Sequence, residues 1–217
     1  MAKLKGILLT EGMHGMISQV EGLAKALEID FTHHKVETNF FWKLIPPNLS
    51  PVSQSVFKKI TDFYHANQNE TKTEVVAGDF VTNIDKKSTP SKTIDLPDQL
   101  KDEIHASLLE DLEQWSSTKL LPTYVYGIRI YQNGAILSSH KDRRETHIIG
   151  TIINIDQDLI NEWPLEIEDH DGEVHKIYLE PGEVIFYESA TLIHGRPDPL
   201  EGKFFSNVFC HYMPKIS

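Results

Sequence analysis

The sequence predicts an α+β protein that is mainly β, with helices first and an antiparallel sandwich or barrel in its C-terminal half. From Pro122 onward, short segments rich in β-branched and aromatic residues follow one another, among them YVYGIRIY, ETHIIGTIINI and GEVIFYE. Turn signals such as Asn133-Gly134 and Asp171-Gly172 separate these segments. Strands at regular intervals with no helix between them indicate antiparallel sheets.

The stretch before Pro122 has a helical pattern. Five apolar residues recur at helical spacing in DQLKDEIHASLLEDLEQW, which follows Pro97: Leu100, Ile104, Leu108, Leu112 and Trp115. This predicts a helix of about 18 residues with the proline at its start, where a missing N–H is harmless.

The chain divides at the proline-rich segment 46–51. Residues 1–52 are expected to form an appendage, with a short strand at 7–9 and an amphipathic helix that runs to about Glu28. Residues 53–217 are expected to form the main domain, with helical support over 53–121 and a β core over 122–217. The proline-rich segment cannot continue a helix, which makes it the best linker.

Composition limits the partners of this protein. Its 217 residues include 21 lysines and arginines against 32 acids, for a net charge of -11. That excess repels phosphate backbones and anionic lipid, so neither nucleic acid nor a membrane surface is an expected partner. The single cysteine, Cys210, excludes an internal disulfide, and a cytoplasmic location is the default expectation.

One pair of residues has the geometry of a metal site. His140 and Asp142 are two apart at the end of a predicted strand, so their side chains can project from one face. His194, in ATLIHGRP, is the natural third ligand. Two histidines and one carboxylate form the facial triad of non-haem iron(II) oxygenases. A solvated His-Asp pair is the alternative interpretation.

A second feature predicts an anion site. Lys203 opens the aromatic-rich strand KFFSNVFCHY, an odd place for lysine unless its ammonium meets an anion. The far carboxylate of a dicarboxylic co-substrate bound to iron would need such a cation. Tyr131, which shares a strand face with Arg129, could donate a hydrogen bond to the same ligand. The alternative for Lys203 is an exposed lysine on an edge strand.

Residues 122–214 resemble the 2-oxoglutarate- and iron(II)-dependent dioxygenases, and among them the prolyl 4-hydroxylases. The likeness rests on YQNGAILSSHKD, HGRP and GKFFSNVFCHY, in that order. It implies a double-stranded β-helix (jelly roll) in which His140, Asp142 and His194 bind Fe(II). It also implies that Lys203 and Tyr131 hold 2-oxoglutarate, with Thr151 close by, and that dioxygen and ascorbate are used.

By this resemblance the expected reaction is hydroxylation of a C–H bond, with a proline-containing peptide or protein as the favoured substrate. Arg196 and Arg143 are candidate substrate contacts at the mouth of the barrel. Two alternatives stay open: an oxygenase of the same fold acting on another side chain or a metabolite, and a non-catalytic β-helix binding module.

The opening segment resembles a different family. LTEGMHGMISQVEGLAKALEID and FFWKLIPPNLSP are similar to the start of the mitochondrial-fission-protein-like family, which has a glycosyltransferase-like fold. No activity is carried over from such a fragment. The alternative is a helical cap or dimerisation arm on the barrel.

Overall fold

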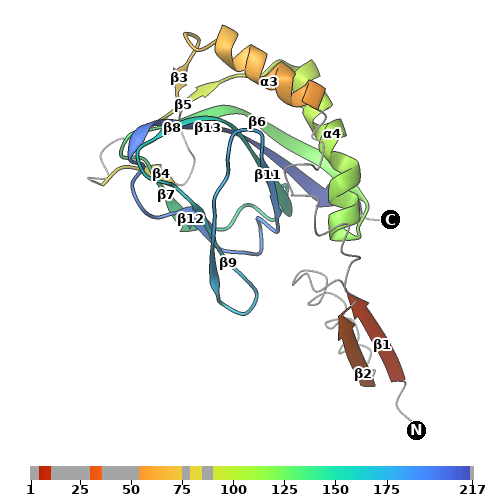
Figure 1. The fold of residues 1–217 in the computed structure, drawn as a ribbon. Coiled ribbons are helices and arrows are strands. Elements are labelled where there is room, and N and C mark those ends of the chain that lie inside the picture. The colour runs from red at the N-terminus through yellow and green to blue at the C-terminus, as the bar shows by residue number, and fades with distance from the viewer. Residues whose placement is uncertain (1–4, 11–29, 36–53, 75–78, 85–89, 216–217) are drawn as a thin grey trace.

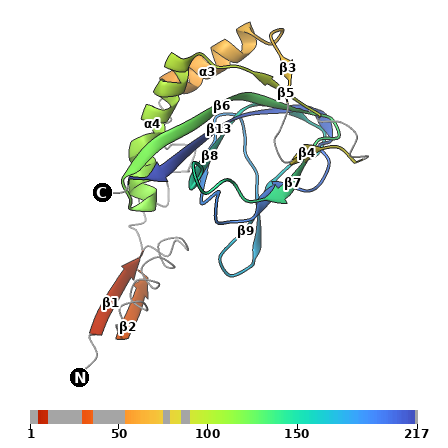
Figure 2. The same ribbon diagram turned by 180° about the vertical axis from the view of Figure 1, so that it is seen from behind.

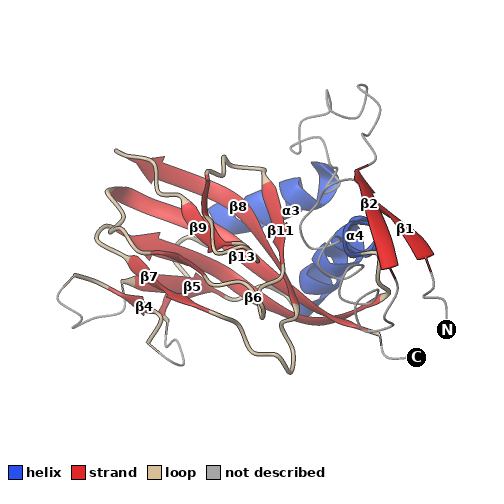
Figure 3. Cartoon of the chain, turned by 90° about the horizontal axis from the view of Figure 1, so that it is seen from below, coloured by secondary structure: helices blue, strands red, loops and turns tan. Residues whose placement is uncertain are grey.

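The protein was analysed as a computed structural model, which describes residues 5–10, 30–35, 54–74, 79–84 and 90–215. Its main body is a sandwich of two antiparallel sheets, with helices packed on one side (Figure 1). Seen from below, the strands of the two sheets run side by side, and the helices lie along the large sheet (Figure 3).

The large sheet has six strands in the order β11-β8-β13-β6-β5-β3. Its long central members supply most of the pairing, because β13 is hydrogen-bonded to β6 on one side and to β8 on the other. The bounds are β3 Lys72–Thr73, β5 Ser91–Ile94, β6 Leu120–Gln132, β8 Ile149–Leu159, β11 Val184–Tyr187 and β13 Gly202–Pro214.

The small sheet has five strands in the order β10-β9-β12-β7-β4. Their bounds are β4 Val81–Thr82, β7 Ile136–His140, β9 Leu165–Glu168, β10 Val174–Ile177 and β12 His194–Arg196. From β6 to β13 the chain passes back and forth between the two sheets, which is the winding of a jelly roll. The predicted double-stranded β-helix is therefore confirmed.

Two helices cover the outer face of the large sheet (Figures 1 and 2): α3 Gln54–Ala66 and α4 Asp98–Ser116. The predicted helix after Pro97 is confirmed, and Pro97 is its N-cap. Leu100, Ile104, Leu108 and Leu112 are buried, as their spacing predicts. They join outward-facing residues of β6, β8 and β13 in one apolar cluster. A second cluster fills the space between the sheets.

The predicted strand at 7–9 falls within β1 Lys5–Thr10, which pairs in parallel with β2 Asp30–Lys35. The predicted helix up to Glu28 and the linker at 46–51 lie outside the described residues, and the division at residue 52 stays a prediction. Within the described ranges, no helix has the length and apolar character needed to cross a membrane.

Candidate metal centre

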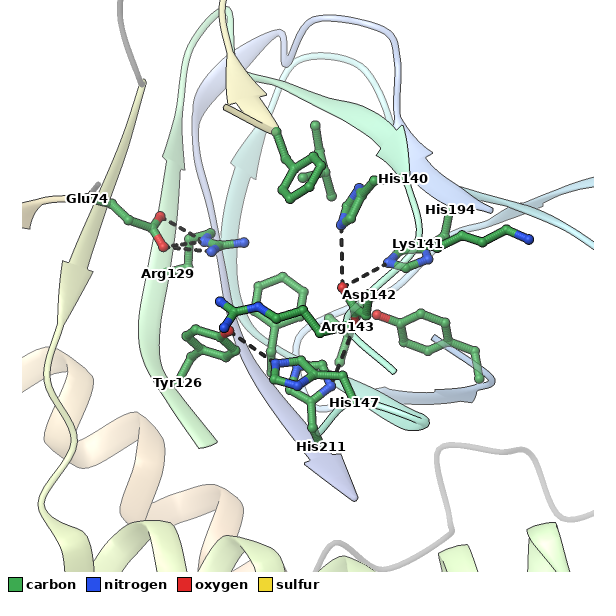
Figure 4. A pocket seen from close by; sticks show the side chains of 15 residues that line it. Glu74, Tyr126, Arg129, His140, Lys141, Asp142, Arg143, His147, His194 and His211 are labelled. Carbon is green, nitrogen blue, oxygen red and sulfur yellow. Dashed lines mark hydrogen bonds and ion pairs between the residues drawn. The ribbon is translucent and has the colours of Figure 1, made fainter. Parts of the chain in front are cut away.

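Two neighbouring strands of the small sheet bring the three predicted ligands together. β12 pairs antiparallel with β7, and His194 lies directly opposite His140 in the register. Asp142 follows His140 by two residues, just past the end of β7. The ligand atoms of these three side chains all lie within 4.8 Å of one another, and they face the same cavity (Figure 4). The predicted convergence is confirmed.

Both histidines are held in the tautomer that a metal requires. His140 Nδ1 lies 2.7 Å from the carbonyl oxygen of Ser138, and His194 Nδ1 lies 3.0 Å from that of Leu192. A carbonyl can only accept, so each Nδ1 donates its hydrogen and each Nε2 keeps its lone pair. These Nε2 atoms lie 3.6 and 3.9 Å from Asp142 Oδ1.

Electrostatics favour the metal-binding forms of His194 and Asp142. Burial, together with the neighbouring His140, lowers the pKa of His194 to about 4. Burial opposes the charge of Asp142, but the nearby imidazoles of His140, His211 and His194 outweigh it and lower the pKa of Asp142 to about 2. Two imidazoles that each offer an Nε2 lone pair, together with one carboxylate, fit a divalent transition metal such as Fe(II).

Aromatic rings hold the ligands in place. The ring of Phe80 stacks on His140 at 4.4 Å between centroids, and Tyr187 meets His194 edge-on at 4.8 Å. Gly195 lets β12 approach β7, since a Cβ there would lie 2.8 Å from the carbonyl oxygen of Leu137. The ligand geometry is therefore built by backbone pairing and ring packing before any metal binds.

Sequence reasoning did not assign several polar residues that share this cavity, among them Tyr126, His147 and His211. His211 Nδ1 is buried, lies 3.7 Å from Asp142 Oδ2 and has no hydrogen-bond partner. The His147 and His211 rings are 3.9 Å apart, and His147 Nε2 lies 3.1 Å from the Tyr126 hydroxyl. Phe209 and His211 are two residues apart on β13 and both line the cavity, so strand alternation was the sequence signal available for His211.

Lys203 does not reach this site, which corrects the sequence-based expectation. It lies at the outer end of β13, its side chain is 79% exposed, and its Nζ pairs with Asp158 Oδ2 at 2.7 Å. The reason is register: β13 runs on for several residues beyond Lys203 before Phe209 and His211 reach the cavity.

Thr151 is also displaced from its expected role. It is fully buried on β8 opposite Cys210, and its neighbour Ile152 lines the cavity. Because successive side chains on a strand face opposite sides, Thr151 points toward the helices.

Of the three remaining predicted site residues, two are buried outside the cavity lining and one lines the cavity. Tyr131 is buried behind the cavity, where its hydroxyl accepts a hydrogen bond of 3.2 Å from Arg129. Arg196 is buried between the rings of Trp163 and Phe205, at 4.7 and 4.3 Å, so it is a core residue rather than a rim residue. Arg143 lines the cavity mouth as expected.

The cavity has a volume of about 230 Å³, which is somewhat below the about 300–1,000 Å³ of small-molecule sites. Its walls mix apolar side chains, including Leu137, Ile152 and Phe209, with the polar groups described above. Such a site can hold a metal ion and one compact ligand beside it.

No family model and no curated protein matches the sequence. Solved structures do match, and they have the same fold. Among solved structures, the chain is similar to a Pseudomonas putida prolyl-4-hydroxylase (TM-score 0.50, 11% identity, 76% of this chain and 89% of that one). It is also similar to HygX from Streptomyces hygroscopicus with nickel, 2-oxoglutarate and hygromycin B bound (0.52, 11%, 73% and 79%).

A third similar structure is a prolyl hydroxylase from Trichoplax adhaerens in complex with a hypoxia inducible factor peptide fragment (TM-score 0.51, 12% identity, 81% of this chain and 94% of that one). At these identities the likeness establishes the fold, which is the jelly roll of the 2-oxoglutarate- and Fe(II)-dependent oxygenases.

Proposed function

We propose that this protein is a 2-oxoglutarate- and Fe(II)-dependent dioxygenase that hydroxylates a C–H bond. One observation carries the proposal: two histidine Nε2 atoms and one carboxylate lie within 4.8 Å of one another at the mouth of a jelly roll. Three protein ligands on one face of a metal leave positions open for a co-substrate and dioxygen. The retained ligands argue against a non-catalytic binding module.

His140, Asp142 and His194 would hold the metal. When bound, Fe(II), 2-oxoglutarate and dioxygen would supply the oxidising chemistry: one oxygen atom of dioxygen would enter succinate as the oxo acid loses carbon dioxide, and the other would enter the substrate C–H bond. The chain itself would orient the bound groups and exclude water from them. The side chains of Leu137, Ile152 and Phe209 give the cavity an apolar lining that limits the access of water.

Peptidyl proline is the proposed substrate, with ascorbate as an auxiliary reductant and a cytoplasmic setting. The structural likeness to two prolyl hydroxylases, one of them in complex with a peptide, supports this choice. Arg143, which is exposed and lines the cavity, would donate a hydrogen bond to a peptide carbonyl of the substrate. Another protein side chain or a metabolite is the second candidate, because the structurally similar HygX binds hygromycin B.

The test incubates purified protein with Fe(II), ascorbate, 2-oxoglutarate and a panel of proline-rich peptides. Succinate formation measures the oxygenase reaction, and mass spectrometry detects the gain of one oxygen atom on proline. Asp142→Ala is the control and should form no succinate. Succinate without any peptide product would move the substrate to the second candidate, whereas no succinate in any condition would contradict the dioxygenase proposal.

A further inference from the structure

The displacement of Lys203 leaves open which cation receives the far end of a dicarboxylic co-substrate. Lys203 is in solvent, Arg196 is enclosed by aromatic rings away from the cavity lining, and Lys141 and Arg143 are exposed at the mouth. Among the described residues that line the cavity, Arg129 is the one buried guanidinium, with a side chain 12% exposed.

Arg129 is held in one orientation by an acid that lies behind it. Its Nε lies 2.9 and 2.8 Å from the two oxygens of Glu74, and its Nη2 lies 2.6 Å from Oε1. Ser91 Oγ donates to Glu74 Oε2 at 2.8 Å and so fixes the carboxylate in turn. The ring of Phe209 lies 4.8 Å from the guanidinium carbon. This ion pair explains how a guanidinium can stay buried before any ligand arrives.

The guanidinium of Arg129 has more N–H donors than its protein partners occupy. Arg129 has five N–H groups in a fixed fork. The Nε–H and one Nη2–H point to Glu74, and one Nη1–H points to the Tyr131 hydroxyl at 3.2 Å. Two N–H groups therefore remain for a ligand, and the Nη1 side of the guanidinium points into the cavity (Figure 4).

Arg129 also lies in a suitable place relative to the metal. It projects from β6 of the large sheet, whereas the metal ligands come from β7 and β12 of the small sheet. Figure 4 shows the guanidinium across the cavity from His140, Asp142 and His194. A short molecule that chelates a metal through one end would point its other end toward the large sheet.

We propose that Arg129 binds the far carboxylate of the 2-oxo diacid, and that Glu74 is a positioning residue that orients the guanidinium. This inference rests on the proposed function. It assigns the anion site to β6 rather than to the start of β13, where the sequence suggested it. In the register, Arg129 pairs with Asn207, four residues beyond Lys203.

The test measures binding without turnover, by calorimetric titration of the full-length protein loaded with Ni(II). Two ligands are compared: 2-oxoglutarate, and 2-oxopentanoate, which has a methyl group in place of the far carboxylate. The wild type should bind 2-oxoglutarate about 10- to 100-fold more tightly, because hydrogen bonds to charged groups contribute that much. Arg129→Lys should reduce this ratio, since an ammonium lacks the fork.

The double variant Arg129→Met with Glu74→Gln removes the cation without leaving a buried unpaired carboxylate, and thermal unfolding would check that it folds. In this double variant the ratio of the affinity for 2-oxoglutarate to that for 2-oxopentanoate should fall close to one, with the affinity for 2-oxopentanoate unchanged. Glu74→Gln alone should weaken binding of 2-oxoglutarate and not of 2-oxopentanoate. Lys203→Met is the matched control and should keep the wild-type ratio.

The outcomes separate the two proposals. A wild-type preference that survives in the double variant, or that is lost in Lys203→Met, would overturn the assignment to Arg129 and leave the dioxygenase proposal intact. Failure of the Ni(II)-loaded wild type to bind either oxo acid would overturn the dioxygenase proposal, and the anion site with it.

Discussion

The two ends of the cavity are built in different ways. At the metal end, His140 and Asp142 are two residues apart and His194 faces His140 across one strand pair. At the opposite end, Arg129 depends on Glu74, which is 55 residues earlier in the chain. The metal end is thus encoded by short spacing plus one strand pairing, whereas the cation end requires segments that no local pattern connects.

The difference shows when the spacing of two residues in the sequence predicts their relative positions in the structure. Two residues on one strand keep their relation whatever the rest of the fold does. The segment of chain from His194 to Lys203 includes a turn and the start of β13, where pairing with β8 is irregular between Gly202 and Phe204. A spacing that crosses such a junction does not determine which face or depth a side chain reaches.

The strongest test of the metal end is Asp142→Ala. Loss of the only carboxylate of the triad should lower Fe(II) affinity and 2-oxoglutarate turnover by more than the about 10- to 100-fold typical of outer-shell changes. Equilibrium dialysis and a succinate assay would measure these effects. Asp158→Ala removes a carboxylate that pairs with Lys203 on the surface and should leave both unchanged. Equal effects of the two variants would contradict the assigned ligand set.

A smaller effect is expected from Gly195→Ala, which tests the strand pairing. The new Cβ would lie 2.8 Å from backbone atoms of Leu137 and Ser139, which cannot move independently of β7. The free energy of unfolding should fall by about 1–3 kcal/mol or more, and Fe(II) affinity should fall with it. Urea denaturation would measure the first. Ser139→Ala, on the exposed side of β7, should change stability by less than about 0.5 kcal/mol.

The stability of the metal-free protein should depend on pH. Burial lowers the pKa of His194 to about 4 and that of His211 to about 3, whereas in the unfolded chain both titrate near 6.5. The unfolded state therefore takes up more protons as the pH falls from about 6.5 toward 4, and stability is lost over that window.

The loss should be at most about 1.4 kcal/mol per pH unit for each histidine. Urea midpoints at several pH values would measure it, and His211→Asn should remove one histidine's share of the slope. A midpoint that does not change between pH 7 and 5 would show that these imidazoles are not buried in the neutral form.

The smallest effect is expected from Lys203→Ala. Its ion pair with Asp158 is exposed on both sides, and such pairs contribute little to stability because solvent screens them. Urea denaturation should show little change, and succinate formation should keep the same dependence on 2-oxoglutarate concentration. A marked rise in the 2-oxoglutarate concentration needed for half-maximal rate would restore Lys203 as the anion-binding residue.

The sequence alone determined the fold class, the helix after Pro97 and the shared direction of His140 and Asp142. Each of these rests on a short-range regularity: strand alternation, helical periodicity, or the two-residue spacing of His140 and Asp142. Only the tertiary structure decided which polar residues surround the ligands and which cation faces them. Register irregularities in β13 and the long-range contact between Glu74 and Arg129 set those positions. Both depend on pairing between distant segments, which leaves no periodic signal in the chain.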